Sequence, residues 1–334
     1  MTIENDSTPQ ARSHRPVRTV LIGTSLGEES DQVVRAGLAV ARAAGAQIYL
    51  VHALEPLLAG FEVGAGPDLQ QEQIDRREQE LSRQVRRLGV DVLDLADTAV
   101  RAGAPHRVIA DTAQKIGADL IVVGATGSGP FAAELLGSTA DRVLRKALCP
   151  VLVVRDGLQV PPRKVLAPVD LSALSGDAFR CGLDVLAQIA GSGEIQVRAV
   201  YALSFMDILT ARQEAGGASL EQAEPDAAAE LRQFVRANRP EAPFGVETTI
   251  LPGEARVEIL HQLEEYPADL LILGTHGRGG MDRLMLGSVA STVARKAPCS
   301  VLVVPPEAAL AEGIAEAVTT QTMPAWHREP AHAV

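Results

Sequence analysis

The chain is poor in aromatic residues and in cysteine, and it has no excess of positive charge. Aromatics make up 3% of its 334 residues, so alanine, valine, leucine and isoleucine must build any core. The net charge of −11 argues against sequence-independent binding of nucleic acid, which requires a basic face that displaces counterions. No apolar run approaches the roughly 20 residues that a membrane helix needs, and residues 1–16 lack the apolar centre of a secretory signal. We therefore expect a protein that acts on neither nucleic acid nor membranes.

The three cysteines are an odd number and form no C-x-x-C pair. This usage is typical of reduced thiols and favours a cytoplasmic protein. A hydrophobic share of 46% beside 22% charged residues describes a folded globular chain. Its length predicts two domains of ordinary size, each with its own core.

One stretch of the sequence occurs twice. Residues 119–154 and 269–304 each read as a buried strand, a glycine-rich turn, a helix and a second strand. In both copies a G-x-x-G turn is followed, after nine further residues, by a Gly-Ser pair. The motif residues are Gly124, Gly127, Gly137 and Ser138 in the first copy, and Gly274, Gly277, Gly287 and Ser288 in the second. The segment that begins near Val20 likewise recurs near Val165, so the duplication spans both halves of the chain.

Short β-branched runs alternate with longer amphipathic segments through each half. In the first half we expect strands at 17–23, 47–53, 90–100, 119–124 and 151–154, with helices between them. This alternation predicts right-handed crossovers and a parallel sheet with helices on both faces, which is an α/β fold. The expected division is a disordered arm (1–16), a first domain (17–155), a linker (156–163), a second domain (164–305) and a mostly mobile tail (306–334), in which 307–318 can form a helix.

The glycine motif has the properties of a phosphate-binding loop. Ligands of a parallel sheet bind beyond the carboxyl ends of its strands, and this loop follows the fourth strand of each half. Glycine lets backbone N–H groups approach phosphate oxygens, and the Gly-Ser pair adds a hydroxyl and the free N–H groups of a helix start. The alternative is that the glycines only form a turn and that Ser138 and Ser288 only cap helices. The identical spacing in two copies favours phosphate binding.

Other nucleotide and catalytic motifs are not indicated. The chain has no G-x-x-x-x-G-K-[ST] loop, and Gly127, Gly129 and Ala132 match the dinucleotide fingerprint only after the fourth strand, not the first. No group of histidines, cysteines or acidic residues has the spacing of a metal site, and no G-x-S-x-G nucleophile motif occurs.

Three features together resemble the universal stress protein family in its tandem two-domain form. They are the G-x-x-G-x(9)-G-S motif after the fourth strand, the V-D-x-S turn at 169–172 and the VLVV strand that ends each half. The resemblance covers nearly all of 17–304. It implies an α/β fold of the adenine-nucleotide alpha-hydrolase-like kind, with two tandem open parallel five-stranded sheets in the order 3-2-1-4-5. For the ATP-binding subclass it implies one ATP per domain, with or without Mg²⁺, and pairing of the last strands within the chain or in a homodimer.

By this resemblance, the contacts to an adenine nucleotide fall on matching positions of the two halves. In the second half they are Asp170, Ala202, Gly274, Gly277, Arg278, Gly287, Ser288 and Val289. In the first half they are Ser25, Ala53, Gly124, Gly127, Gly137, Ser138 and Thr139. Asp170 is then expected to bond the ribose or the adenine side, with Ala202 near the adenine and Arg278 near the phosphates. The first half has Ser25 in place of the aspartate and no basic residue in its loop, so we expect the second site to bind ATP more tightly.

Three functions remain open on the sequence. The first is an ATP-binding regulatory protein of the stress response, in which the nucleotide controls conformation or the binding of a protein partner. The second is a slow ATPase or nucleotidyl-transferring enzyme, although no general base, acidic metal pair or nucleophile is evident near the loops. The third is a nucleotide-free dimerisation module whose glycine loops no longer bind a ligand.

Overall fold

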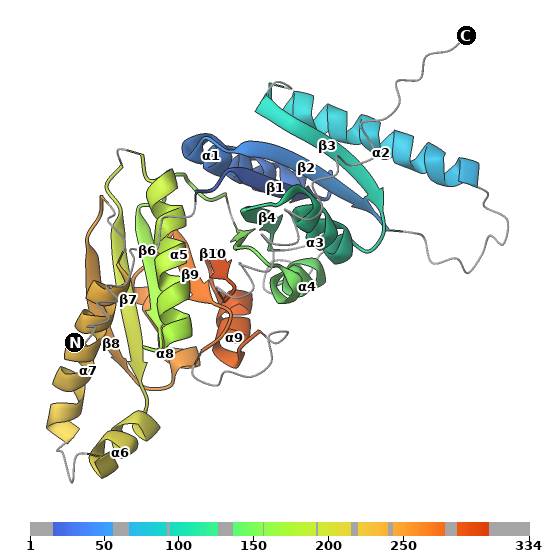
Figure 1. Cartoon of the computed structure of the whole chain (residues 1–334). Helices are drawn as coiled ribbons and strands as arrows, with labels where there is room; N and C mark the ends of the chain where they lie inside the picture. The colour runs from blue at the N-terminus through green and yellow to red at the C-terminus, as the bar shows by residue number, and fades with distance from the viewer. Residues whose placement is uncertain are drawn as a thin grey trace, which may run out of the picture.

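Ten strands form one sheet in the order β3-β2-β1-β4-β5-β10-β9-β6-β7-β8 (Figure 1). The computed structural model describes residues 16–55, 67–91, 94–125, 136–155, 157–191, 193–214, 220–239, 243–277 and 286–306. The strands of each half run parallel, and the halves meet where β5 and β10 pair antiparallel, with Leu152 beside Leu302. The predicted α/β fold and the strand order 3-2-1-4-5 are confirmed in both halves, and the pairing of their last strands joins the two five-stranded sheets into one.

The elements of the first half alternate as the sequence predicts. They are β1 (Thr19–Thr24), the 3₁₀ turn η1 (Glu28–Ser30), α1 (Asp31–Ala44), β2 (Gln47–Leu54), α2 (Pro67–Arg87), β3 (Leu95–Ala102), α3 (Pro105–Ile116), β4 (Leu120–Gly124), α4 (Ser138–Lys146) and β5 (Val151–Val154). Those of the second half are β6 (Lys164–Val169), α5 (Ala173–Ile189), β7 (Gln196–Leu203), α6 (Phe205–Glu214), α7 (Leu220–Asn238), β8 (Val246–Pro252), α8 (Ala255–Glu265), β9 (Leu270–Gly274), α9 (Ser288–Lys296) and β10 (Ser300–Val304).

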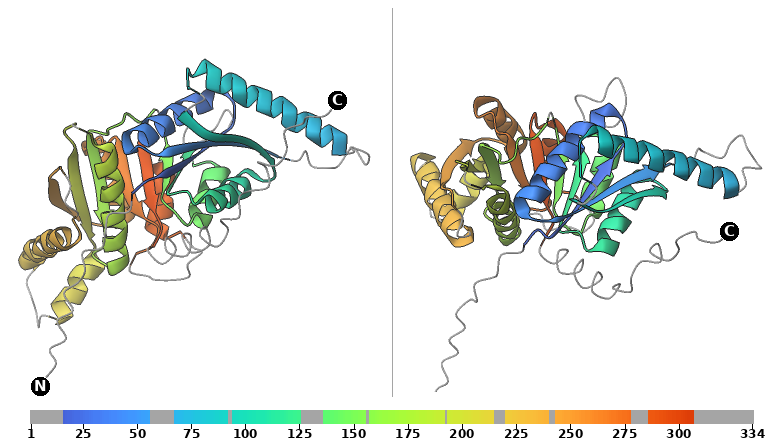
Figure 2. Two further views of the ribbon diagram at one scale, coloured as in Figure 1. Left: turned by 45° about the horizontal axis from the view of Figure 1, so that its top comes forward. Right: turned by 90° about the horizontal axis from the view of Figure 1, so that it is seen from above.

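Helices cover both faces of the sheet (Figure 2). On one face the core lies under α1, α2, α5 and α7, and on the other it lies under α3, α4, α8 and α9. Each core contains residues of both halves, such as Val34 with Leu183 on the first face and Val143 with Val293 on the second. The central strands are therefore buried on both sides, as a parallel sheet of β-branched and leucine residues requires.

The sequence signals for helix ends are met in the structure. Gly45 and Gly117 end α1 and α3 with left-handed φ angles of 67° and 64°, which a residue without a Cβ adopts most readily. Pro105 occupies the first turn of α3, where its missing N–H costs no helical hydrogen bond.

Two predictions of elements differ from the structure. The third strand, predicted at 90–100, is β3 at Leu95–Ala102, because the Val90 N–H instead bonds the Val85 carbonyl at 3.2 Å at the end of α2. Helix α6 was not predicted at all. Its start is fixed by Ser204 and Asp207, which satisfy each other's backbone N–H groups as an S-x-x-D capping box.

Several predictions fall on residues that the structure does not describe. They are the arm up to residue 15, the tail from 307 with its helix at 307–318, and the loop residues Gly127 and Arg278. The domain boundaries at 17–155 and 164–305 also stay predictions. Among the described helices, none has the length and apolar character needed to cross a bilayer. Cys149 and Cys299 are buried thiols, and burial raises the pKa of Cys299 to about 12.

Candidate functional site

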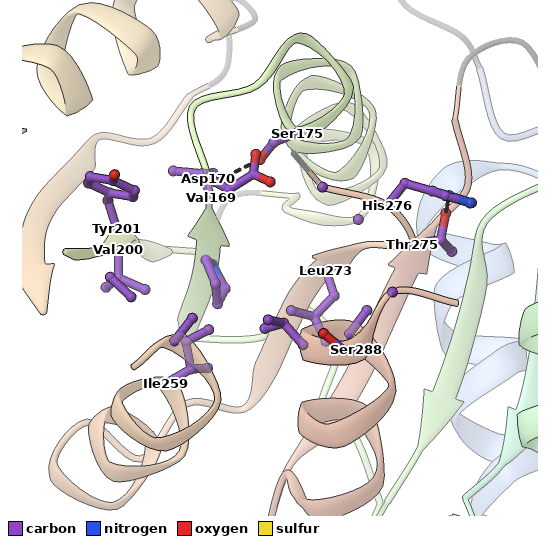
Figure 3. Close-up of a pocket in the computed structure, with 18 of the residues that line it drawn as sticks. Val169, Asp170, Ser175, Val200, Tyr201, Ile259, Leu273, Thr275, His276 and Ser288 are labelled. Carbon is purple, nitrogen blue, oxygen red and sulfur yellow. Dashed lines mark hydrogen bonds between the residues drawn. The ribbon is translucent and has the colours of Figure 1, made fainter. Parts of the chain in front are cut away.

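A cavity of about 620 Å³ opens beyond the carboxyl ends of β6, β7 and β9 (Figure 3). Strand β6 lies between β7 and β9, so the chain order of the sheet reverses here. Crevices at such switch points are the usual ligand sites of open α/β sheets. The first residues of α8 and α9 complete the wall.

Asp170 stands at one side of the cavity, held by the turn that leads into α5. Its Oδ1 accepts hydrogen bonds from the N–H of Ser172 at 3.0 Å and from the Ser172 hydroxyl at 2.6 Å. Its own N–H donates to the Ser175 hydroxyl at 3.1 Å. Leu171 between them has φ of 63°, a left-handed conformation that costs a non-glycine residue on the order of 1–3 kcal/mol. The turn therefore holds the carboxylate in place at a local cost.

Gly277 passes directly against this carboxylate. A Cβ added to Gly277 would collide with Oδ2 of Asp170. The first glycine of the motif, Gly274, is also confined, because a Cβ there would lie 3.0 Å from the Cβ of Ala178. Glycine is therefore needed at these two positions for two reasons. A side chain would collide with neighbouring atoms of the site, and, as the sequence indicates, it would also block the approach of a phosphate to the backbone.

The first turn of α9 faces Asp170 across the cavity (Figure 3). Gly287 is the N-cap, with φ of −55° and ψ of 152°, and its N–H donates to the Thr275 carbonyl at 2.8 Å. Ser288, Val289 and Ala290 follow and line the cavity. Ser288 does not cap α9, because it is the first residue of the helix and the N-cap is Gly287. No side chain of the N-cap bonds the helix start. The unpaired N–H groups of this turn and the helix dipole favour an anion.

Acidic groups line the cavity where it borders β7 and α8, which β6 separates from β9 and the start of α9. Asp207 is fixed by hydrogen bonds from the Ser204 N–H at 3.0 Å and the Ser204 hydroxyl at 2.7 Å, and Glu254, the N-cap of α8, also lines the cavity. Carboxylates suit hydrogen-bond donors such as hydroxyl and amino groups. Within the described part of the chain, no group of three or more His, Cys, Asp or Glu side chains is placed to hold a metal ion. The cavity therefore favours an anion beside the start of α9 and the hydrogen-bond donors of a ligand beside Asp207 and Glu254.

The structure brings together every described residue that was predicted for the second site. Asp170, Ala202, Gly274, Gly277, Gly287, Ser288 and Val289 all line the cavity. Sequence reasoning missed Ser175, Tyr201, Asp207, Glu254 and His276, which line it too. The S-x-x-D box signalled Asp207, whereas His276 gave no signal. Its Nδ1 lies 2.8 Å from the hydroxyl of the buried Thr275.

In the first half, the predicted residues occupy the corresponding elements. Ser25 follows β1, Ala53 lies in β2, Gly124 ends β4, Gly137 is the N-cap of α4, and Ser138 and Thr139 begin α4. The closing hydrogen bond of the loop also recurs, since the Gly137 N–H donates to the Ala125 carbonyl at 2.6 Å. The scaffold of the two sites is therefore the same.

The polar groups of the first half are largely bonded to one another. The Ser25 hydroxyl donates to the Glu29 carboxylate at 3.0 Å. Fully buried Gln84 of α2 bonds the hydroxyls of Thr24 and Ser30 at 2.8 and 3.0 Å. Two of these residues, Ser25 and Ser30, occupy the repeat positions of Asp170 and Ser175, which line the cavity of the second half.

Two ionisable groups border this network. The Arg87 guanidinium donates to the Asp31 carboxylate and holds its pKa below the ordinary value. Burial lowers the pKa of His52, whose Nδ1 donates to the Thr24 carbonyl at 2.9 Å. Burial therefore favours the neutral form of His52, which donates to the carbonyl at the end of β1.

Comparison with known proteins places the chain among stress proteins. The sequence model described as "Universal stress protein family" matches residues 16–155 and again 162–305. A universal stress protein of Mycobacterium tuberculosis is 29% identical over 266 residues, which cover 76% of this chain and 85% of that protein. One of Mycolicibacterium smegmatis is 26% identical over 304 residues, 86% of this chain and 97% of that protein.

Solved structures share the fold along most of the chain. A functionally unknown protein of Pseudomonas aeruginosa superposes with a TM-score of 0.62 at 18% identity, covering 91% of this chain and 98% of the other. A universal stress protein of Archaeoglobus fulgidus gives a TM-score of 0.57 at 20% identity, covering 87% and 99%. At these identities the likeness concerns the fold alone.

Proposed function

Because the chain belongs to the universal stress protein family, we propose that it is a stress-response regulator that binds an adenine nucleotide in the cavity of its second half. The observation that carries the proposal is the polarity of the cavity. The helix start at Ser288, after β9, favours an anion, and the carboxylates after β7 and before α8, on the other side of β6, favour hydrogen-bond donors. A nucleotide has the same polarity, with phosphates at one end and ribose hydroxyls and a base amino group at the other.

The proposed contacts follow from the positions of the lining residues. Phosphates lie against the N–H groups of Ser288 and Val289 and the backbone at Gly277. The ribose bonds the Asp170 carboxylate, and the base lies near Ala202 at the end of β7. The cavity volume of about 620 Å³ is within the usual range for a ligand of this size. Arg278, outside the described residues, is proposed to approach the phosphates.

We propose that the first half binds ATP more weakly. Ser25 supplies a neutral hydroxyl where the second half has a carboxylate, and that hydroxyl is already bonded to Glu29. The Ser25 hydroxyl can therefore meet a ligand only as a neutral acceptor, whereas Asp170 offers a charged carboxylate, whose hydrogen bonds are stronger. One tight and one weak site per chain are expected.

The proposed setting is the cytoplasm, with thiols kept reduced, and the proposed ligand is ATP, with or without Mg²⁺. The nucleotide would act by favouring one conformation of the loop between Gly274 and Gly287, of which 278–285 lie outside the described residues, and so alter a surface that partners bind. The enzymatic alternative requires turnover, so release of phosphate from radiolabelled ATP by the purified protein would favour it.

Calorimetric titration with ATP tests the proposal. Asp170→Asn removes the charge but keeps a similar shape, and we expect ATP affinity to fall about tenfold, or roughly 1.4 kcal/mol. Asp226→Asn is the matched control, because Asp226 is exposed on α7 and does not line the cavity. Absence of ATP binding by the wild-type protein would refute the proposed function and favour the nucleotide-free module.

A further inference from the structure

Helix α9 is held at its C-terminal end by the first half of the chain. Arg155, which follows β5, donates from Nη2 to the carbonyls of Ala294 and Arg295 at 3.2 and 3.0 Å. The last carbonyls of a helix have no partners within the helix, and a cation there interacts favourably with its dipole. The first half therefore bonds the C-terminal carbonyls of α9, the helix whose N-terminal end lines the cavity.

Two more contacts support this arrangement. Ser300, buried at the start of β10, accepts a hydrogen bond from the Arg155 N–H at 3.0 Å and donates to the Arg155 carbonyl at 3.1 Å. Asp141 of α4 accepts a hydrogen bond from Nη2 of Arg295 at 2.8 Å. The main chain and the guanidinium of Arg155 are thus fixed together, and α9 is tied to α4 as well.

The first half holds a helix of the second half, but the residues at the matching repeat positions cannot make the reverse contacts. In the duplicated sequence Arg155 corresponds to Pro305, Ser300 to Pro150 and Asp141 to Ser291. A proline side chain donates no hydrogen bond, and Ser291 carries no charge. The second half therefore cannot hold α4 in the way in which the first half holds α9.

We propose that Arg155 is a positioning residue for the anion-binding end of the second half's cavity. Helix α9 has 9 residues and is about 13 Å long, at 1.5 Å per residue. A helix this short moves as one rigid body. A displacement of its C-terminal end therefore also moves the N–H groups of Ser288 and Val289 at its N-terminal end. By holding that end, the first half sets the place of the donors that meet the ligand's phosphates. This inference rests on the proposed function and assigns a role in it to the half with the weaker site.

The test compares a ligand that has phosphates with one that lacks them. ATP and adenosine are titrated into the full-length protein, with ligand-observed NMR to measure weak adenosine binding. In Arg155→Ala we expect ATP affinity to fall roughly five- to tenfold, at the low end of couplings between separated sites. Adenosine affinity stays within about twofold of wild type, because adenosine makes no contact with the start of α9. Arg155→Lys, which keeps a cation and a donor, restores most of the ATP affinity.

The control is Arg42→Ala. Arg42 is a half-exposed arginine of the first half that bonds Asp94 at 2.8 Å and does not contact the second half through that bond. We expect Arg42→Ala to leave the affinities for ATP and for adenosine unchanged. Unchanged ATP affinity in Arg155→Ala, or an equal loss for ATP and adenosine, would overturn the inference while leaving the proposed function standing. If Arg155→Ala does not fold, Asp141→Asn undergoes the same comparison. A wild-type protein that binds neither ligand overturns the proposed function and this inference with it.

Discussion

At the scale of single residues, the site depends on how closely Asp170 and Gly277 approach each other. The sequence predicted both residues, one as an acidic contact and the other as a phosphate-loop glycine. It could not show that they touch, because they follow β6 and β9, two strands far apart in the sequence that are neighbours only in the sheet. The S-x-x-D pattern could have marked Asp207 as a capping residue, but neither it nor any pattern around His276 reveals that these side chains line the cavity.

Gly277→Ala should weaken ATP binding by about tenfold, because the added Cβ collides with Oδ2 of Asp170 and one of the two must move. Gly245→Ala is the matched control, since a Cβ there meets no atom within 4 Å. Titration calorimetry measures both variants, with thermal unfolding as a check on folding. Wild-type ATP affinity in Gly277→Ala would show that the contact between loop and carboxylate is not part of the site.

The Asp141 carboxyl predicts a dependence of stability on pH. Burial acts to raise its pKa, but the hydrogen bonds from Arg145 and Arg295 outweigh burial and hold the pKa below its ordinary value of 3.8. A carboxyl with a lowered pKa stabilises the folded state above the unfolded pKa, and this contribution is lost as the pH falls through the folded pKa.

Asp141→Asn should therefore lower the free energy of unfolding at pH 7 by about 1 kcal/mol, a modest value because Arg295 is 46% exposed. The difference from wild type should close only at pH values below 3.8. Urea unfolding at several pH values measures it. A difference that stays constant down to the most acid condition would mean that the carboxylate charge is not its source.

At the scale of elements, the helices of the two halves are placed against the sheet by glycines that the sequence analysis did not single out. Gly182 of α5 lies against Ile272 of β9, and Gly37 of α1 lies against Ile22 of β1. The periodicity of apolar residues predicted both helices, but not how closely they pack. The missed α6 has a similar cause, because its apolar pattern is weak and its start depends on a local capping box.

Gly182→Ala should destabilise the protein by about 1–3 kcal/mol, since its methyl group would overlap with Cγ2 of Ile272 in a packed core. Gly245→Ala again serves as the reference for a glycine with open space. Chemical denaturation compares the two. Equal stability of Gly182→Ala and wild type would indicate that α5 can move away from the sheet at little cost.

At the scale of the whole molecule, the two halves share one sheet and two cores. The sequence predicted the duplication, and the resemblance allowed the last strands to pair either within the chain or between chains. The structure pairs β5 with β10 inside the chain. The outer edges of β5 and β10 are then both occupied by this pairing. A homodimer of this chain would therefore have to use another surface. This could not be predicted from the repeat, because identical VLVV strands are equally suited to either pairing.

Heat should unfold the chain in a single cooperative transition, because residues of both halves contribute to each core and to the central strand pair. Differential scanning calorimetry tests this, with the calorimetric and van't Hoff enthalpies expected to agree. Two resolved transitions would show that the halves are stable independently of each other and that the shared sheet contributes little.

The central claim, that the second half holds an adenine nucleotide, is tested most directly by the ligand itself. The purified full-length protein is equilibrated with ATP, freed of unbound ligand and denatured, and the released nucleotide is identified and counted. We predict about one adenine nucleotide per chain for the wild-type protein, held in the cavity of the second half, and a large loss in Gly277→Ala. Absence of bound nucleotide from the wild-type protein, or equal amounts from both proteins, would contradict the account.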